Sequence, residues 1–423
     1  MRLVTKRLKG GRAAGEVLEL LDERARALGV GTAAALCGDW FGSRAVLAPA
    51  VRAVPAADAF APLRAMGDVR GAMPGAVGGG WFGYLSYDLA DPSGRSTGIP
   101  HAVWGWAGHV LRQDHGGQWW FEALVPDGEP DPDALCAEFE DLLTRPAPTS
   151  GWTPVRLDRP LPHHDAVKAC VHAIEAGELF QANICTRFTG EFRGSPAALF
   201  AEGVRTLAPG RAACLSGDWG AVVSFSPELF LSRHGNRVRS VPIKGTLPRR
   251  GPEDDELRQR LRRSTKDVAE NVMITDLVRN DLGRVCTVGS VRVPDLLTVR
   301  PAPGVWHLES TVEGELAAGR TDEDLLRAAF PPGSVTGAPK IRALDLIAEL
   351  EPAARGVYTG TVGLASPVAG LELNVAIRTL EIRDGRIALG VGGGITADSD
   401  PEREWQECLH KAAPLEALLA RGR

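Results

Sequence analysis

Short turn signals between strand-like runs constrain the fold of this chain more than any other feature of its sequence. The segments HGN (234–236) and DG (384–385) each separate two such runs, as the turns of β-hairpins do. Hairpins make neighbouring strands antiparallel, and helical runs are interleaved with these strands. The sequence therefore predicts an α+β fold of largely antiparallel sheets with helices packed outside.

Charge and composition exclude several classes of protein. The 423 residues carry a net charge of −5, which gives no electrostatic basis for binding nucleic acid or an anionic membrane. No apolar run approaches the ~20 residues of a membrane span, and the N-terminus lacks the apolar stretch of a signal peptide. The seven cysteines are scattered and never spaced as CxxC, which argues against a zinc ribbon or a disulfide framework. We expect a cytoplasmic protein with neither nucleic-acid nor membrane partners.

One shift in composition suggests a boundary between two regions. The stretch RPAPTSGWTP (145–154) is rich in proline, serine and glycine and follows a helical run. We therefore expect an N-terminal region over 1–150 and a second domain over 151–423.

The C-terminal helix DPEREWQECLHKA is the most informative single element. Asp400 is its expected cap, and Glu404, Glu407 and Lys411 follow at i, i+3 and i+7 on one stripe. Two carboxylates on one stripe could bind a hard cation such as Mg²⁺, which prefers oxygen ligands. The same pattern is also typical of a solvated face with one ion pair.

Two neighbouring patterns bear on this choice. The glycine run GVGGGITADSD (390–400) predicts either a tight turn or exposed backbone N–H groups that cradle an anion before the helix. The helical run 265–284 carries Asp267, Glu270, Asp276, Arg279, Asn280 and Asp281 among apolar residues. Such charges must be paired or bound, so this run contains either a salt-bridge network or a metal ligand.

Several other motifs bear on the kind of site this chain can form. FPPGSVTGAPK (330–340) does not have the spacing of a phosphate-binding loop, and no GxGxxG, nucleophile elbow or HExxH is present. The run FQANICTRF (180–188) alternates as a strand, with Phe180 and Ala182 on one face and Gln181 on the other.

Two single residues each allow a structural and a functional interpretation. His307 shares a strand face with Glu309, where a lone histidine is usually structural. Lys244, in VPIKGT, is either a solvated edge residue or a group placed for chemistry.

A set of motifs resembles the chorismate-utilising enzymes, which include anthranilate, aminodeoxychorismate, isochorismate and salicylate synthases. The resemblance spans about residues 160–415 and implies that family's fold, a sandwich of largely antiparallel sheets. The motifs, in order, are GELFQANICTRF, SPELF, VPIKGTLPRR, ENVMITDLVRNDLG, VWHLESTVEGEL, FPPGSVTGAPK, GVYTGTVG, AIRTL, GVGGGI and EREWQECLHKA.

The resemblance implies roles for particular residues. Glu270, Glu404 and Glu407 match the magnesium ligands, and Glu228 matches the acid that assists departure of the chorismate C4 hydroxyl. His307 matches a further active-site position. The implied contacts to chorismate are Gln181, Thr246, Tyr358, Arg378, the amides of Gly392 and Gly393, and Lys411.

Two positions separate the reactions of this family. Gln181 stands where the water-activating lysine of isochorismate and salicylate synthases is found, and an amide cannot act as that base. Lys244 lies in PIKGT, which resembles the aminodeoxychorismate synthases, whereas anthranilate synthases read PIAGT. The resemblance implies that Lys244 attacks C2 of chorismate, and that ammonia then adds at C4 to give 4-amino-4-deoxychorismate.

The resemblance also implies partners. Nothing in the chain resembles a glutaminase, so ammonia would come from a separate glutamine amidotransferase subunit or from solution. The product would serve p-aminobenzoate and folate synthesis or a specialised metabolite. The segment AALCGDWFGSRAVLA lacks the LLES-like pattern of a tryptophan pocket. Anthranilate synthesis and a non-catalytic regulatory role are the alternatives.

Overall fold

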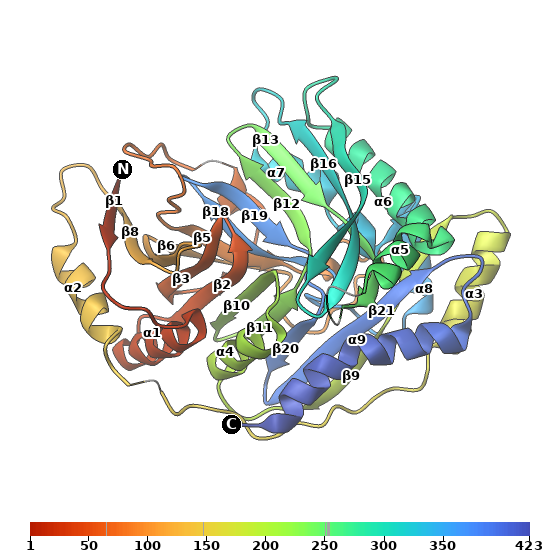
Figure 1. The fold of residues 1–423 in the computed structure, drawn as a ribbon, viewed down its shortest axis with the longest axis horizontal. Helices are drawn as coiled ribbons and strands as arrows, with labels where there is room; N and C mark the ends of the chain where they lie inside the picture. The colour runs from red at the N-terminus through yellow and green to blue at the C-terminus, as the bar shows by residue number, and fades with distance from the viewer. Residues whose placement is uncertain (65, 147, 250, 252–253) are drawn as a thin grey trace.

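The computed structural model describes residues 1–64, 66–146, 148–249, 251 and 254–423. Residue 147 of the predicted boundary stretch (145–154) and residue 250, the last of VPIKGTLPRR, fall outside these ranges. Two large sheets dominate the described chain, and every described pair of neighbouring strands in them runs antiparallel (Figure 1). The predicted α+β fold with largely antiparallel sheets is confirmed.

The first sheet contains eleven described strands. In spatial order they are β1 (Arg2–Arg7), β8 (Trp119–Val125), β7 (His109–Gln113), β3 (Ser43–Val51), β2 (Thr32–Trp40), β10 (Arg211–Gly217), β11 (Gly220–Ser226), β20 (Thr379–Arg383), β21 (Arg386–Ile395), β9 (Gln181–Glu191) and β17 (Gly337–Ala338).

The second sheet is built on β16 (Val305–Glu315), which pairs with three strands. In spatial order the described strands are β14 (Ile243–Pro248), β16, β13 (Arg237–Val241), β12 (Leu229–His234), β19 (Gly370–Asn374), β18 (Thr361–Ser366), β5 (Gly80–Leu85), β6 (Ala102–Ala107) and β4 (Val54–Pro55), with β15 (Arg292–Ala302) on the other edge of β16.

Helices cover the outer faces of the two sheets, and apolar side chains such as Leu36 of β2 and Phe82 of β5 meet between them. The described helices are α1 (Ala14–Leu28), α2 (Asp133–Leu142), α3 (His164–Glu175), α4 (Pro196–Leu207), α5 (Asp255–Arg263), α6 (Thr265–Gly283), α7 (Asp322–Ala329), α8 (Lys340–Leu350) and α9 (Pro401–Arg421), with 3₁₀ turns at Ala61–Leu63, Tyr87–Leu89 and Gly333–Val335.

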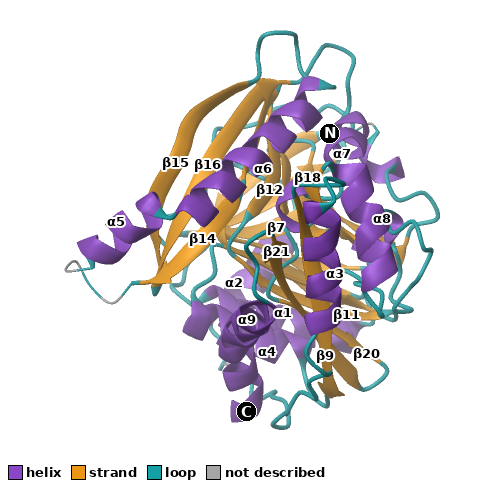
Figure 2. Cartoon of the chain, turned by 90° about the vertical axis from the view of Figure 1, so that its right-hand side faces the viewer, coloured by secondary structure: helices purple, strands orange, loops and turns teal. Residues whose placement is uncertain are grey.

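Two of these helices position the candidate site. α9 packs along β21 (Figure 1), and α6 packs across β16 and β14 (Figure 2). α9 begins as expected, with the Asp400 side chain accepting a hydrogen bond from the Arg403 N–H and proline in the first turn. Within the described ranges, no helix is long and apolar enough to cross a membrane.

The regions 1–150 and 151–423 share both sheets. β2 pairs with β10 in the first sheet, and β5 pairs with β18 in the second. These ladders join strands on either side of residue 150, so the hydrophobic core is continuous across that point. The division into two regions stays a prediction drawn from composition.

Two local expectations were wrong. Phe180 is 71% exposed and precedes β9, while Ala182 of the expected face is buried. Gln181 on the opposite face is buried as well, because this strand is covered on both sides. The glycines of GVGGGI lie inside β21, paired in register with β9, and do not form a strand-to-helix turn.

Candidate active site

Three glutamates from two helices converge on the glycine run of β21. A Cβ atom built on Gly393 would lie 3.1 Å from Glu404 Oε2 and 3.5 Å from Glu407 Oε1. One built on the next residue, Gly394, would lie 3.0 Å from Glu270 Oε2. The strand can approach all three carboxylates because these two positions carry no side chain. The tertiary structure thus brings the three predicted acidic residues together.

Each of these carboxylates has a lysine within ion-pair distance. Lys244 Nζ lies 3.6 Å from Glu270 Oε2, and Lys411 Nζ lies 2.7 Å from Glu407 Oε1. The third lysine, Lys266, lies 3.1 Å from Glu404 Oε1 and 4.0 Å from Glu270 Oε1. The positive charges of the lysines therefore offset the negative charges of the glutamates.

Burial and these lysines have opposite effects on the carboxyl groups. Burial raises the pKa of Glu270 above its ordinary value, and Lys244 and Lys266 only partly offset that rise. For Glu407 burial also acts to raise the pKa, but the ion pair and hydrogen bond from Lys411 outweigh it and hold the pKa below its ordinary value. Charge on Glu270 therefore depends on a nearby cation.

The acidic residues have the right chemistry for Mg²⁺. All three offer carboxylate oxygens, the ligand type of a hard cation, and Oε2 of buried Glu404 has no hydrogen-bond partner. Within the described ranges, however, no group of three or more His, Cys, Asp or Glu side chains is already gathered closely enough to hold a metal ion. The three carboxylates have the chemistry that Mg²⁺ requires, but in this structure each of them is paired with a lysine.

A β-bulge directs Lys244 toward this cluster. β14 pairs with β16 as Ile243 with Glu309 and Thr246 with His307, and the register shifts between these pairs. Gly245 lies in the bulge with φ of +84°, and a Cβ there would come within 2.9 Å of an Asp267 side-chain atom. Only glycine fits this position. The Lys244 side chain, 11% exposed, is therefore enclosed and is not a solvated edge residue.

Gln181 contacts the same centre from β9. Its Nε2 lies 3.4 Å from Glu270 Oε2, and its Oε1 is buried without a partner. An unpaired buried amide oxygen is costly unless a ligand or water satisfies it. Gln181 is thus placed to donate to a carboxylate and to accept from a bound molecule.

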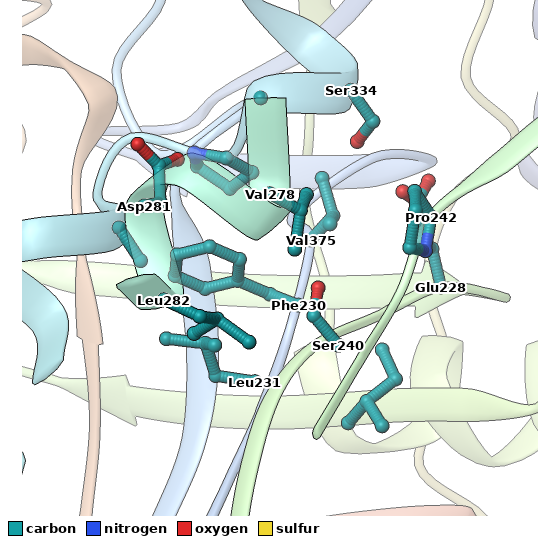
Figure 3. Close-up of a pocket in the computed structure, with 14 residues that line it drawn as sticks. Glu228, Phe230, Leu231, Ser240, Pro242, Val278, Asp281, Leu282, Ser334 and Val375 are labelled. Carbon is teal, nitrogen blue, oxygen red and sulfur yellow. The ribbon is translucent and has the colours of Figure 1, made fainter. Parts of the chain in front are cut away.

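Glu228 lies between β11 and β12 and lines a small cavity. Figure 3 shows it beside Pro242, with Asp281 at the far end of the same cavity. Its Oε1 accepts a 3.4 Å hydrogen bond from the Ile243 N–H. Burial raises the pKa of Glu228 to about 7, although a hydrogen bond from Ser334 and the charge of Lys244 act to lower it. Glu228 can therefore carry a proton near neutral pH.

Arg378, His307 and Thr246 are a second group of predicted site residues that lie near one another. Arg378 is half-buried, with a left-handed φ of +51° just before β20. Among the described residues, no carboxylate lies within ion-pair distance of its guanidinium, and burial lowers its pKa. Burial and Arg378 together lower the pKa of His307 to about 4, so this imidazole is neutral at physiological pH. Its Nδ1 shares a 2.9 Å hydrogen bond with Thr246 Oγ1.

The pairing of β21 with β9 decides which glycine amides are free. Opposite Gly392 and Gly394 lie Cys185 and Asn183, whose N–H groups donate away from β21. Antiparallel partners exchange both backbone bonds or neither. The N–H groups of Gly392 and Gly394 therefore point away from β9, whereas that of Gly393 points into the sheet. The N–H group of Gly393 is therefore turned away from the site, and what this residue contributes is the space left by its missing side chain.

Two further predicted residues border the glycine run. Lys411 Nζ donates to the carbonyl oxygen of Gly392 at 2.7 Å, besides its ion pair with Glu407. Tyr358 packs its ring against Gly390, and its hydroxyl lies 3.9 Å from Cys185 Sγ. Lys411 thus faces the carboxylate cluster directly. Tyr358 lies further back along β21, beside Gly390.

Two features of the site are not among the residues predicted from the motifs. Lys266 precedes Glu270 by four residues on α6, an i,i+4 spacing that could have drawn attention to it. The buried ion pair of Arg355 with Glu351 supports β9, because Glu351 also accepts from the Cys185 N–H. Only its spacing of four residues marks that pair in the sequence. The salt-bridge network predicted as one interpretation of 265–284 is present only in part: Asp276 pairs with Arg279 at the surface of α6.

Comparison with known proteins assigns this site to a family. Residues 42–417 match the family described as chorismate binding enzyme. The chain belongs to this family.

Within the family, several relatives share the name aminodeoxychorismate synthase component 1. The protein of Klebsiella aerogenes is 46% identical over 56% of this chain, and that of Salmonella typhimurium is 37% identical over 79%. The aligned segments cover 53% and 75% of those proteins, so the chain matches only about half the length of the Klebsiella protein. Anthranilate synthase component 1 of Streptomyces coelicolor is 41% identical over 65% of this chain and 54% of its own length.

Solved structures share the fold. Anthranilate synthase component I of Streptococcus pneumoniae superposes with a TM-score of 0.71 at 30% identity, covering 80% of this chain and 81% of its own. The menaquinone-specific isochorismate synthase of Escherichia coli gives a TM-score of 0.74 at 22% identity over 99% of this chain and 94% of its own. The predicted family fold is confirmed.

Proposed function

We propose that this chain is the chorismate-aminating component of an aminodeoxychorismate synthase, which converts chorismate and ammonia to 4-amino-4-deoxychorismate. The observation that carries the proposal is the enclosed Lys244, turned by its bulge onto Glu270. Relatives that bear this name at 37–46% identity support it. The enzyme would act in the cytoplasm.

Chorismate carries two carboxylates, and the site offers cationic and amide donors for them. The guanidinium of Arg378 suits a carboxylate in bidentate geometry, and Lys411 adds a second positive charge. The N–H groups of Gly392 and Gly394 lie on the open edge of β21, and Lys411 bonds to the carbonyl oxygen of Gly392. Tyr358, Thr246 and Gln181 complete the proposed contacts.

Glu270, Glu404 and Glu407 would hold Mg²⁺. When bound, the cation would neutralise the ring carboxylate of chorismate and fix its position. Its oxygen ligands come from α6 and α9, so binding would also hold these helices in place around the substrate.

Lys244 and Glu228 would carry the bond changes. After its ammonium group has released a proton to water, the amine of Lys244 forms a bond to C2 of chorismate, the ring double bonds shift, and the C4 hydroxyl leaves as water with a proton from Glu228. Ammonia then forms a bond to C4, the double bonds shift back, and the C2–N bond to Lys244 breaks. The extra proton of the new C4 ammonium group returns to Glu228. Glu228 can supply the proton because burial raises its pKa to about 7. His307, neutral and anchored to Thr246, would orient the substrate without adding charge.

The ammonia would come from a separate glutamine amidotransferase subunit. Relatives named component 1 support a second component. All seven cysteines of this chain are buried, so none is accessible as the thiol nucleophile of a glutaminase.

Product analysis tests the proposal against anthranilate synthesis. Purified protein is incubated with chorismate, Mg²⁺ and ammonium, and the product is identified by mass and NMR. We expect an amine at C4 with the enolpyruvyl group retained. An amine at C2 with release of pyruvate would establish anthranilate synthesis, and no turnover would favour a non-catalytic paralogue.

A further inference from the structure

Lys266 bridges two of the three site carboxylates that belong to different helices. Its ammonium lies 3.1 Å from Glu404 Oε1 on α9 and 4.0 Å from Glu270 Oε1 on its own helix, α6. The same Glu404 oxygen also accepts a 2.7 Å hydrogen bond from Ser399 Oγ. A single positive charge thus lies between the two buried acids and offsets their repulsion.

A divalent cation shared by Glu270 and Glu404 would need the same place. Mg²⁺ binds oxygen at about 2.0–2.1 Å, closer than an ammonium can approach. The two carboxylates would have to draw together around the cation, and the ammonium of Lys266 would be excluded from between them. Lysine and metal therefore compete for one position.

We propose that Lys266 is a built-in counter-cation, which occupies the magnesium position in the metal-free protein and leaves it when Mg²⁺ binds. This inference rests on the magnesium site of the proposed function. It assigns to Lys266 a positioning role, because the residue keeps the acidic ligands aligned until the cation replaces it.

The other two lysines of the site are less suited to leave. Lys244 is only 11% exposed. Lys411 is 43% exposed, but it pairs with Glu407 and the Gly392 carbonyl oxygen and not with Glu270 and Glu404. Lys266 is 43% exposed, while Glu404 beneath it is 4% exposed. Its long side chain can therefore rotate into water without unfolding anything around it.

Removing the lysine should have opposite effects on the two states. Lys266→Met keeps the length of the side chain but removes the charge, so Glu270 and Glu404 repel each other in the metal-free protein. The variant should melt at a lower temperature in EDTA. It should bind Mg²⁺ about three- to tenfold more tightly, because no ion pair must break and no positive charge opposes the cation.

Two measurements without turnover test this. Isothermal titration with Mg²⁺ gives the Kd, and thermal unfolding in EDTA and in saturating Mg²⁺ gives the stability of each state. Lys9→Met removes the same charge from an exposed lysine of the N-terminal region and should change neither quantity. Lys266→Arg keeps the charge and should retain the weaker, wild-type Mg²⁺ affinity.

The outcomes are distinguishable. Tighter Mg²⁺ binding by Lys266→Met, with a melting deficit that closes as Mg²⁺ is added, supports the inference. Equal or weaker affinity in this variant, while wild type binds Mg²⁺, overturns it and leaves the metal site intact. Absence of Mg²⁺ binding in both proteins overturns the magnesium site and this inference together.

Discussion

Lys244 Nζ lies 3.6 Å from Oε2 of Glu270, and these side chains are only 11% and 9% exposed. The proposed nucleophile and a proposed metal ligand are therefore adjacent in an enclosed space. Covalent attack and cation binding would occur at one centre, where each group influences the other.

Lys244→Ala should abolish both the covalent intermediate and the product. With wild type, chorismate and Mg²⁺ but no ammonia, intact-mass analysis should show an adduct of chorismate less one water, which digestion maps to the peptide VPIKGTLPR. The variant should show no adduct and at least about a hundredfold loss of turnover, because the amine that forms the bond to C2 is removed.

Lys244→Arg provides the matched test, since it keeps the charge but cannot be deprotonated to attack. It should be as inactive as the alanine variant while still binding chorismate. Wild-type turnover by Lys244→Ala would mean that ammonia attacks chorismate directly.

Glu228 should impose a pH limit on catalysis. Its pKa is about 7, raised by burial, and only the protonated form can serve as the acid. The value of kcat/KM should therefore fall as pH rises above about 7. Glu228→Gln should lose about 10²- to 10⁴-fold in rate and lose this limb of the profile. A wild-type pH profile in the glutamine variant would assign the limb to another group.

The same substitution should stabilise the fold at alkaline pH. The folded-state pKa of about 7 lies above the ordinary 4.5, so the stability that Glu228 contributes is present below pH 4.5 and is lost as pH rises through 7. Glu228→Gln should therefore gain up to about 3 kcal/mol over wild type at pH 8 and little at pH 4.5. Urea unfolding at the two pH values measures this; a gain at both would point to a cause other than ionisation.

Removal of the metal should abolish turnover. In addition, Glu404 of α9 should contribute far more to Mg²⁺ binding than Glu402 of the same helix. EDTA should stop the reaction and Mg²⁺ should restore it. Glu404→Gln should weaken Mg²⁺ binding by at least about tenfold, because its buried Oε2 has no other partner. Glu402→Gln, on the exposed face of the same helix, is the matched control and should bind Mg²⁺ normally. Full activity in excess chelator would refute the magnesium assignment.

Ammonium, but not glutamine, should support turnover by the single chain. The buried cysteines provide no accessible thiolate, and burial raises the pKa of Cys170 and Cys408 to about 12. Product formation with each nitrogen source is followed by mass spectrometry. Glutamine-dependent turnover by the rigorously purified chain would reveal an amidotransferase site within it.

Features that depend on near neighbours in the chain could be predicted from the sequence. Asp400 caps α9 as predicted, and Thr321 and Asp324, which have the spacing of a capping box in the sequence, form one at the start of α7. The alternation of β16 correctly places His307 and Glu309 on one strand face. These outcomes follow from side-chain chemistry and strand or helix periodicity within a few residues, which the sequence contains in full.

Some expectations failed where distant segments decide the outcome. The glycine run became strand because β9 supplies a full pairing partner, and the missing side chains make room for carboxylates from α6 and α9. The stripe of Glu404 and Glu407 was predicted correctly, but its two members differ: Glu404 is buried and Glu407 is half exposed. Helical spacing sets which residues share a stripe, not what packs over each of them.

The sequence by itself determined the α+β class, the caps of helices α7 and α9, and the residue types available for chemistry. Only the tertiary structure decided which charges meet. Lys266 and Glu404 are 138 residues apart in the chain, and their contact exists because α6 and α9 approach β21 from different parts of the fold. Periodicity acts over a few residues, whereas ion pairing and burial depend on distance in space, and that distance is fixed only when both sheets and their helices pack.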